Sequence, residues 1–267
     1  MLKRLLFAIL WCVAAGRAAA VDYTDIWYIP AESGWGVNVV EAQATPFPVM
    51  FLTFFIYGPD GKPTWYVATV TQDATGKFNG PLFSTTGTSF ALPWVPGQFL
   101  GTQVGTASFQ PTGPSTANLV YTVSSGPILA SVAKAIQRQT LTVIPMGGIY
   151  SGGQSGAYSG CTMSTTNASY RDFFDLQITH VSNGTTVGTL TLSFAYQNFS
   201  CAFSGTYQQN GQLYSVPSAT YQCSDGLNTT ASMSEIKVTA QGVEGRFSAP
   251  SVGGNCREDA RFSAVVN

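Results

Sequence analysis

The stretch Glu32–Thr71 most constrains the fold, because it holds two apolar segments joined by one turn. Val49–Ile56 is apolar except for one threonine, and it is too short to cross a membrane as a helix, which needs about 20 residues. Its length and composition predict a strand buried on both faces. The turn at 57–63 is rich in Pro and Gly, which preset φ or tolerate a positive φ. We expect an antiparallel hairpin, with Thr64–Thr71 as the returning strand and Trp35–Glu41 on its other edge.

Segments of the same kind continue through the chain, bounded by Gly, Pro, Asn or Asp. They predict an all-β protein with little helix, built from two consecutive antiparallel domains, each a barrel or a sandwich. Each half opens with an aromatic strand and a Ser-Gly pair. By fold analogy alone, these openings are similar to the first strand of calycin-type barrels. The predicted strands are 25–29, 35–42, 48–57, 64–72, 77–84, 103–110, 117–124 and 132–142, then 148–151, 156–162, 172–181, 187–196, 199–209, 212–223, 231–241, 243–248 and 258–266.

The first twenty residues have the features of a secretory signal peptide. Lys3 and Arg4 precede a short apolar core, and Ala18-Ala19-Ala20 supplies a cleavage site. The apolar core is shorter than a spanning helix, so we expect no membrane span after cleavage. The sequence therefore predicts an exported protein, periplasmic or extracellular. Its predicted parts are a signal peptide at 1–20, an aromatic-rich domain without cysteines at 21–145 and a disulfide-stabilised domain at 146–267.

Charge is sparse after the signal peptide. Three of the twelve Lys and Arg residues lie within residues 1–20, which leaves nine against thirteen Asp and Glu and a net charge of about −4. Nine dispersed basic residues form no patch of the kind that binds nucleic acid or an anionic membrane surface. With 28 glycines and abundant Thr, Ser, Tyr and Phe, this composition is typical of an exported β protein.

Four cysteines remain in the exported chain: Cys161, Cys201, Cys223 and Cys256. An even number predicts two disulfides, for which three pairings exist. A two-residue turn at Asn210-Gly211 would place Cys201 opposite Thr220, with Cys223 on the other face of the sheet. Pairing Cys201 with Cys223 would then require a bulge, which the Pro217 region can supply. No metal site is predicted, because no CxxC pair is present and the single histidine is remote in sequence.

Several ordered motifs carry a resemblance over residues 25–142. The chain resembles an uncharacterised family of secreted Gram-negative bacterial proteins with an ESGWG segment and a following YxxDGxPxW hairpin. The resemblance implies an exported β protein and brings no activity and no catalytic residues. Its second half resembles no family in this way. The motifs are Trp27–Gly36, Tyr57–Trp65, Gly80–Leu82, Thr86-Gly87 and Lys134–Gln139.

His180 is the only histidine, and it shares a strand face with Phe174, Leu176 and Ile178. A general base needs a reacting partner nearby, and the sequence contains no G-x-S-x-G, HExxH or P-loop motif. We interpret His180 as a rim residue that caps an apolar face. The sequence predicts no catalytic residue and no cofactor, which favours a protein that is not an enzyme.

Glu32 and Glu41 are the best candidates for a carboxylate pair of the kind that hydrolyses glycosides. The alternative is structural. Lys134, Ile136 and Arg138 share one strand face, and cations inside a barrel need carboxylate partners. Glu32 and Glu41 are the natural partners, and such a network is either structural or lines a polar pocket.

Aromatic residues crowd into the first half. Exposed Trp and Tyr stack on sugar rings or anchor protein interfaces, and the alternative is that all of them form core. Trp65 and Tyr66 point to opposite faces, which, with the doubly apolar Val49–Ile56, predicts a sheet covered on both faces. Glycines on either side of Trp35 predict a bulge or turn that aims its side chain. The aromatic residues are Trp27, Tyr28, Trp35, Trp65, Tyr66 and Trp94.

These observations favour a secreted, non-catalytic binding or surface-interaction protein of a bacterial envelope, with a glycan or a protein as ligand. The candidate ligand-binding residues are Trp35, Trp65, Tyr66, Glu32 and Arg138. Two alternatives remain open: a secreted hydrolase that uses Glu32 and Glu41, and a structural subunit of an envelope assembly whose apolar strand forms an oligomer contact.

Overall fold

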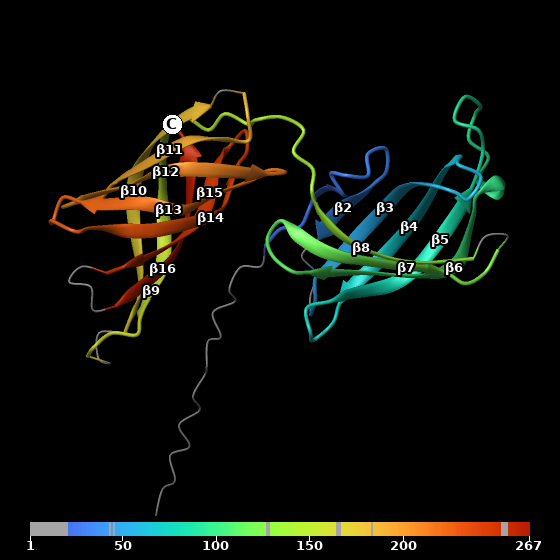
Figure 1. Ribbon diagram of the computed structural model, residues 1–267, viewed down its shortest axis with the longest axis horizontal. Helices are drawn as coiled ribbons and strands as arrows, with labels where there is room; N and C mark the ends of the chain where they lie inside the picture. The colour runs from blue at the N-terminus through green and yellow to red at the C-terminus, as the bar shows by residue number, and fades with distance from the viewer. Residues whose placement is uncertain are drawn as a thin grey trace, which may run out of the picture.

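The chain forms two closed antiparallel β barrels of eight strands each, one after the other in sequence (Figure 1). The structure is a computed structural model that describes residues 21–267 apart from 43, 45, 127–128, 164–166, 183 and 252–255. The predicted signal peptide at 1–20 lies outside the described residues. The all-β prediction is confirmed, and within the described ranges the only helical element is a 3-10 turn at Pro96–Gln98.

Barrel 1 is a meander in which each strand pairs with the next and β1 closes on β8. Its predicted strands agree with the observed ones to within a few residues. The strands are β1 (Asp25–Tyr28), β2 (Gly36–Ala42), β3 (Val49–Tyr57), β4 (Pro63–Gln72), β5 (Phe78–Thr86), β6 (Leu100–Pro111), β7 (Thr116–Val123) and β8 (Ala130–Arg138).

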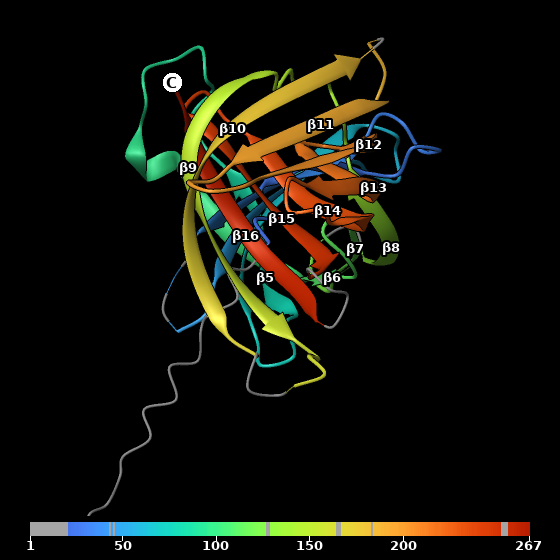
Figure 2. The ribbon, with the colours of Figure 1, turned by 90° about the vertical axis from the view of Figure 1, so that its left-hand side faces the viewer.

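Barrel 2 has the same order, and β9 pairs with both β10 and β16 (Figure 2). The predicted strands 148–151 and 156–162 are one strand, β9. Its glycines mark close approach of the neighbouring strand rather than a break, because a Cβ on Gly152 would lie 2.1 Å from the Ser263 carbonyl oxygen. The strands are β9 (Gly148–Ser159), β10 (Ser169–Ser182), β11 (Val187–Ala195), β12 (Ser200–Asn210), β13 (Leu213–Cys223), β14 (Asn228–Val238), β15 (Gly242–Pro250) and β16 (Arg257–Val266).

The side chains of strand β3 alternate between the interior of barrel 1 and its outer surface. Met50, Leu52 and Phe54 are fully buried inside barrel 1, whereas Phe51 is 45% exposed and Phe55 is 56% exposed on the outer surface. The prediction that both faces of this strand are covered was therefore wrong. A closed barrel covers only its inner face, and no described residue fully covers the outer face of β3 at these two positions.

Both predicted disulfides form, as Cys161–Cys256 and Cys201–Cys223. The hairpin turn falls at Gly211-Gln212, one residue later than predicted, because Asn210 pairs with Leu213. A register shift then follows, in which the extra residue of β13 lies between Ser215 and Ala219. This bulge beside Pro217 brings Cys201 directly opposite Cys223.

A buried ion pair of barrel 1 holds the tip of a barrel 2 hairpin. Arg138 donates to Asp25 Oδ2 at 3.0 Å and to the carbonyl oxygen of Pro114 at 2.9 Å, and both charged side chains are buried. The backbone N–H of Gln212, at the tip of the β12–β13 hairpin, donates to the same Asp25 oxygen at 3.1 Å. The Arg138 guanidinium, predicted as part of a ligand site, is thus enclosed and bound by the chain itself.

The segment between the barrels follows the same hairpin. Thr140 Oγ1 accepts a hydrogen bond from the Gly211 N–H at 2.8 Å, and Gln209 donates to the Thr142 carbonyl oxygen at 2.8 Å. The Tyr214 hydroxyl bonds to both the N–H and the carbonyl oxygen of Ile144. These contacts satisfy the polar groups of the linker against barrel 2.

Replacing Gly211 with Ala should lower the stability of the junction. Gly211 has a φ of +62°, and a Cβ there would lie 2.2 Å from Asp25 Oδ2 and 2.7 Å from Arg138 Cβ. Gly226 is the matched control, because its φ is +99° but no atom lies within 4 Å of its Cβ position. We expect Gly226→Ala to cost about 1–2 kcal/mol in urea unfolding and Gly211→Ala to cost clearly more. Equal losses would show that the hairpin does not bear on the ion pair.

Candidate functional site

Glu32 and Trp35 form a small cluster with Lys134 at the rim of barrel 1. Glu32 Oε2 accepts hydrogen bonds from Trp35 Nε1 at 3.1 Å and from Lys134 Nζ at 2.5 Å, and the ammonium lies 5.2 Å from the centre of the Trp35 ring. The hydrogen bond from Lys134 lowers the pKa of Glu32. Lys134 is thus the cation that Glu32 contacts, while Asp25 takes the place predicted for a glutamate beside Arg138.

The remaining predicted residues lie elsewhere. Trp65 is 51% exposed on the outer surface of barrel 1, beside Phe55, whereas Tyr66 packs against the barrel core. Arg138 lies in the buried junction described above. The five residues proposed as one site therefore divide among a rim, an outer face, a core and a junction.

The carboxylates considered for hydrolysis lie at opposite ends of β2. Glu32 precedes the strand, and Glu41 lies near its end, where it accepts a hydrogen bond from the Tyr23 N–H at 2.8 Å. The five residue steps from Gly36 to Glu41 span about 17 Å at about 3.3 Å per step. Glycosidase carboxyl groups are about 5–10 Å apart, so this pair does not have the required geometry.

His180 caps the apolar interior of barrel 2 at the end that faces barrel 1. It accepts a hydrogen bond from the Met146 N–H at 3.3 Å, and its ring contacts Tyr207 and Tyr214 edge-on. Burial lowers the pKa of His180 and so favours the neutral ring. The interpretation as a rim residue over an apolar face agrees with these contacts.

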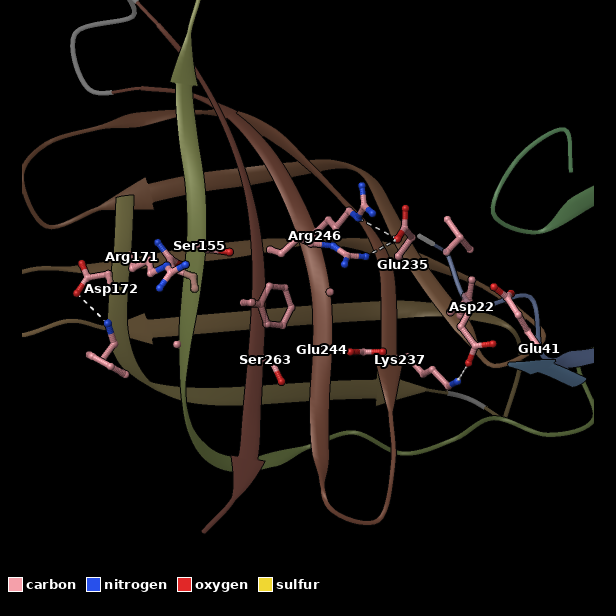
Figure 3. Close-up of a pocket in the computed structure, with 18 residues that line it drawn as sticks. Asp22, Glu41, Ser155, Arg171, Asp172, Glu235, Lys237, Glu244, Arg246 and Ser263 are labelled. Atoms are coloured by element: carbon pink, nitrogen blue, oxygen red, sulfur yellow. Dashed lines mark hydrogen bonds and ion pairs between the residues drawn. The ribbon is translucent and has the colours of Figure 1, made fainter. Parts of the chain in front are cut away.

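A groove of about 660 Å³ runs between the outer face of barrel 2 and the first residues of barrel 1 (Figure 3). Glu235 has a φ of 52° beside an irregularity of β14, and it contacts Arg246 at 2.9 Å and Arg261 at 3.3 Å. Lys237 contacts Asp22 of barrel 1 at 2.7 Å. These ion pairs are made within the chain, so we assign the groove to the junction of the barrels.

A second cavity of about 660 Å³ opens at the end of barrel 2 that faces away from barrel 1. Aromatic side chains form its walls in two stacked pairs. The rings of Tyr158 and Tyr170 have centres 5.2 Å apart, and those of Tyr196 and Phe199 have centres 4.4 Å apart. Tyr221 completes this aromatic lining. We call this cavity the barrel 2 mouth.

A chain of hydrogen bonds crosses the barrel 2 mouth. The Tyr196 hydroxyl donates to Gln154 Oε1 at 2.8 Å, and the Gln154 amide donates to the Tyr170 hydroxyl at 3.2 Å. The Tyr170 hydroxyl in turn donates to Glu258 Oε1. The four hydrogen-bonded residues come one each from β9, β10, β16 and the connection after β11. Closure of the barrel therefore brings them together.

A glycine makes room for this arrangement. A Cβ at Gly156 would lie within 2.7 Å of three atoms of the Tyr170 side chain. Gly156 faces inward on β9, where it is paired with Tyr170 across one edge and Ala260 across the other. The missing side chain therefore lets the Tyr170 ring lie across the barrel interior.

Burial sets the protonation states in the barrel 2 mouth. Burial raises the pKa of Glu258, although the hydrogen bond from Tyr170 opposes this change in pKa. Burial likewise raises the pKa of Tyr170, Tyr196 and Tyr221. The hydroxyls therefore keep their protons and act as hydrogen-bond donors near neutral pH.

Both disulfides lie at the rim of this cavity. Cys201–Cys223 joins β12 to β13, and Cys161–Cys256 joins the segment after β9 to the residue before β16. Three of these cysteines line the cavity. The crosslinks restrain the connections around the mouth, and a restrained site loses less conformational entropy when a ligand binds.

Sequence reasoning missed the residues of the barrel 2 mouth. Gln154, Tyr170 and Glu258 are far apart in sequence, and no motif joins them. Alternation along β9 and β16 places Gln154 and Glu258 on the inward face among apolar residues. Polar residues at inward positions of a predicted barrel were the signal that could have found the site.

The described chain also lacks two other kinds of feature. No helix in the described ranges is long and apolar enough to cross a membrane. Among the residues that the structure describes, no group of three or more His, Cys, Asp or Glu could hold a metal ion.

Replacing Glu258 with Gln should remove a pH dependence of stability. Because the folded-state pKa lies above the ordinary value of 4.5, ionisation of Glu258 disfavours the folded state. This contribution is absent below pH 4.5, and stability falls as pH rises through the raised pKa. Glu258→Gln keeps an acceptor for Tyr170. We therefore expect it to gain stability relative to the wild type at about pH 8 but not at about pH 4, measured by urea unfolding. A pH-independent difference would contradict this assignment.

Comparison with known proteins gives little guidance. No family model and no curated protein matches the sequence. Among solved structures, the chain is similar to transferrin-binding protein B of Haemophilus parasuis Hp5, a vaccine antigen solved as a tryptophan-to-alanine mutant. The two share 11% sequence identity over 90% of this chain and 67% of that chain, with a TM-score of 0.28. A similarity this low assigns no family.

Proposed function

We propose that this protein is an exported, non-catalytic binding protein of a bacterial envelope that holds an uncharged glycan in the barrel 2 mouth. The observation that carries the proposal is the hydrogen-bonded set Gln154, Tyr170, Tyr196 and Glu258 inside an open, aromatic-walled cavity. The predicted signal peptide and the two disulfides support export, because disulfides form and persist in oxidising compartments.

The chemistry of the cavity favours a sugar. Aromatic faces stack on the apolar faces of sugar rings, and tyrosine hydroxyls, an amide and carboxyl groups can exchange hydrogen bonds with sugar hydroxyls. The volume of about 660 Å³ falls in the range of small-ligand sites. Asp172, Asp225 and Glu258 all line the cavity, against Arg171 alone, so an anionic ligand would meet repulsion.

The backbone positions of Asp172 and Glu258, two carboxyl residues of the mouth, lie far apart along β9. Asp172 is opposite Gln154 and Glu258 is opposite Tyr158, so the two acids are offset by four residues along β9. This offset is about 13 Å at the backbone, longer than the separation of about 5–10 Å between glycosidase carboxyl groups. Glu258 also accepts a hydrogen bond from Tyr170. This arrangement supports binding rather than bond cleavage.

Removing one hydroxyl from the mouth should weaken glycan binding. Tyr170→Phe removes both the donor to Glu258 and the acceptor of Gln154 without changing the ring. Tyr207→Phe is the matched control, because Tyr207 is buried in the same barrel but lines no part of the mouth. With neutral oligosaccharides of glucose and of N-acetylglucosamine as probes in calorimetry, we expect Tyr170→Phe to weaken binding by about tenfold or more. Tyr207→Phe should bind as the wild type does.

Three outcomes would contradict the proposal. The first is equal binding by both variants. The second is loss of binding in Trp65→Ala, which would move the site to the outer face of barrel 1, where Trp65 is exposed and a protein ligand could also dock. The third is hydrolysis of the bound oligosaccharide that is lost in Glu258→Gln.

Opening the Cys201–Cys223 disulfide should weaken the same binding without unfolding the barrels. In the double variant Cys201→Ser with Cys223→Ser, the β12–β13 hairpin keeps its ladder, but the rim of the mouth loses a restraint. We expect weaker oligosaccharide binding in calorimetry at temperatures where the circular dichroism spectrum is unchanged. Unchanged affinity in this variant would show that the mouth is ordered without the crosslink.

A further inference from the structure

The connection between β5 and β6, residues 87–99, exposes more large apolar side chains than any other connection of the described chain. Phe90 is fully exposed, and Leu92, Trp94 and Phe99 are 63%, 62% and 57% exposed. No charged residue occurs between Lys77 and Lys134. Exposed apolar side chains are ordinary when they are scattered singly, but a contiguous group marks an interaction surface.

This connection is a folded element with its own hydrogen bonds. The Leu92 N–H donates to the Ser89 carbonyl oxygen at 2.9 Å, and Thr88 Oγ1 both accepts from the Val95 N–H and donates to the Val95 carbonyl oxygen. The 3-10 turn adds a bond from the Gln98 N–H to the Val95 carbonyl oxygen at 3.0 Å. Several of its backbone polar groups are therefore satisfied locally while its apolar side chains point outward.

The connection stands clear of the rest of the molecule. It joins the strand ends at Thr86 and Leu100, and in both ribbon views it projects from barrel 1 beyond the neighbouring strands (Figures 1 and 2). It lies at the end of barrel 1 opposite the junction with barrel 2. A convex projection of this kind can enter another phase without displacing any other part of the chain.

We propose that the 87–99 connection inserts into the interfacial region of a phospholipid bilayer and holds the protein on a membrane surface. Insertion is favoured by exposed apolar side chains, by backbone groups with internal partners and by the absence of charge to be desolvated. The connection exposes apolar side chains and carries no charge, and several of its backbone groups have internal partners. Trp94 is the residue type that favours the headgroup level of a bilayer. A protein partner would need a complementary hollow, whereas a bilayer accepts a convex tip as it stands.

Charged residues nearby limit the depth of insertion. The Asp60–Lys62 ion pair lies in the β3–β4 turn and the Glu32–Lys134 pair lies on the rim, both at the same end of barrel 1. These charges stay in the aqueous headgroup region, so the tip enters the interface and does not span the bilayer. The proposed attachment is independent of glycan binding, because the two sites lie on different barrels.

The test uses the full exported chain and vesicles of zwitterionic phosphatidylcholine. The wild type should float with the vesicles, and lipids brominated near the headgroup should quench its tryptophan fluorescence, a measurement that needs no variant. The triple variant Phe90→Ser, Leu92→Ser, Trp94→Ser should partition at least about tenfold more weakly. Phe173→Ser is the matched control and should float as the wild type does, because Phe173 is 83% exposed on the outer face of barrel 2.

Any of three results would overturn the proposal. One is a wild-type protein that does not float with neutral vesicles. Another is binding only to anionic vesicles that salt abolishes, because the connection carries no charge. The third is light scattering that shows wild-type dimers and monomers of the triple variant, with no vesicle binding by either, because the connection would then be a contact between copies.

Discussion

Closure of each sheet into an eight-stranded barrel is the constraint on which the rest of the structure depends. The interior of such a barrel is just wide enough for its own side chains or for one small ligand. In barrel 1 large buried residues such as Trp27, Phe54 and Phe109 fill the interior, and Arg138 lies over the Trp27 ring at the junction. Barrel 2 is filled along most of its length but ends in a cavity lined by tyrosines.

The polar groups at the two ends of barrel 2 have different hydrogen-bond partners. At the junction, the buried Tyr214 hydroxyl bonds to the backbone of Ile144, and His180 Nδ1 accepts a hydrogen bond from the Met146 N–H. At the other end, Gln154, Tyr170 and Glu258 bond to one another at the surface of a cavity. A buried polar group is costly without a hydrogen-bond partner. The connected set gives each of its polar groups a partner when no ligand is bound, and it leaves lone pairs that a ligand can use. This difference is why we place binding at the mouth.

Local sequence chemistry predicted the strands well, because side-chain alternation and turn residues are local properties. Closure is not local, and the error on β3 follows from it. Val49–Ile56 was expected to be covered on both faces, whereas a barrel leaves Phe51 and Phe55 outside. The pairing of Cys201 with Cys223 depended on one extra residue near Pro217, a shift that alternation alone does not locate.

The candidate site was less predictable than the fold. Tryptophans and Glu32 were predicted as site residues because those residue types often carry function, yet Glu32 bonds to Lys134 and Trp27 is core. The members of the barrel 2 mouth come together only when β16 returns to β9. Their mutual contacts could therefore not be predicted from local sequence. The polar residues at inward positions could be recognised from the sequence.

The claim that the barrel 2 mouth is a glycan site is tested most directly by nuclear magnetic resonance of the wild-type chain during titration with a neutral oligosaccharide. The account predicts that the side-chain amide of Gln154 and the ring signals of Tyr158 and Tyr196 shift together and saturate at one sugar per chain. Shifts confined to the Trp65 indole on barrel 1, with the Gln154 amide unchanged, would contradict it.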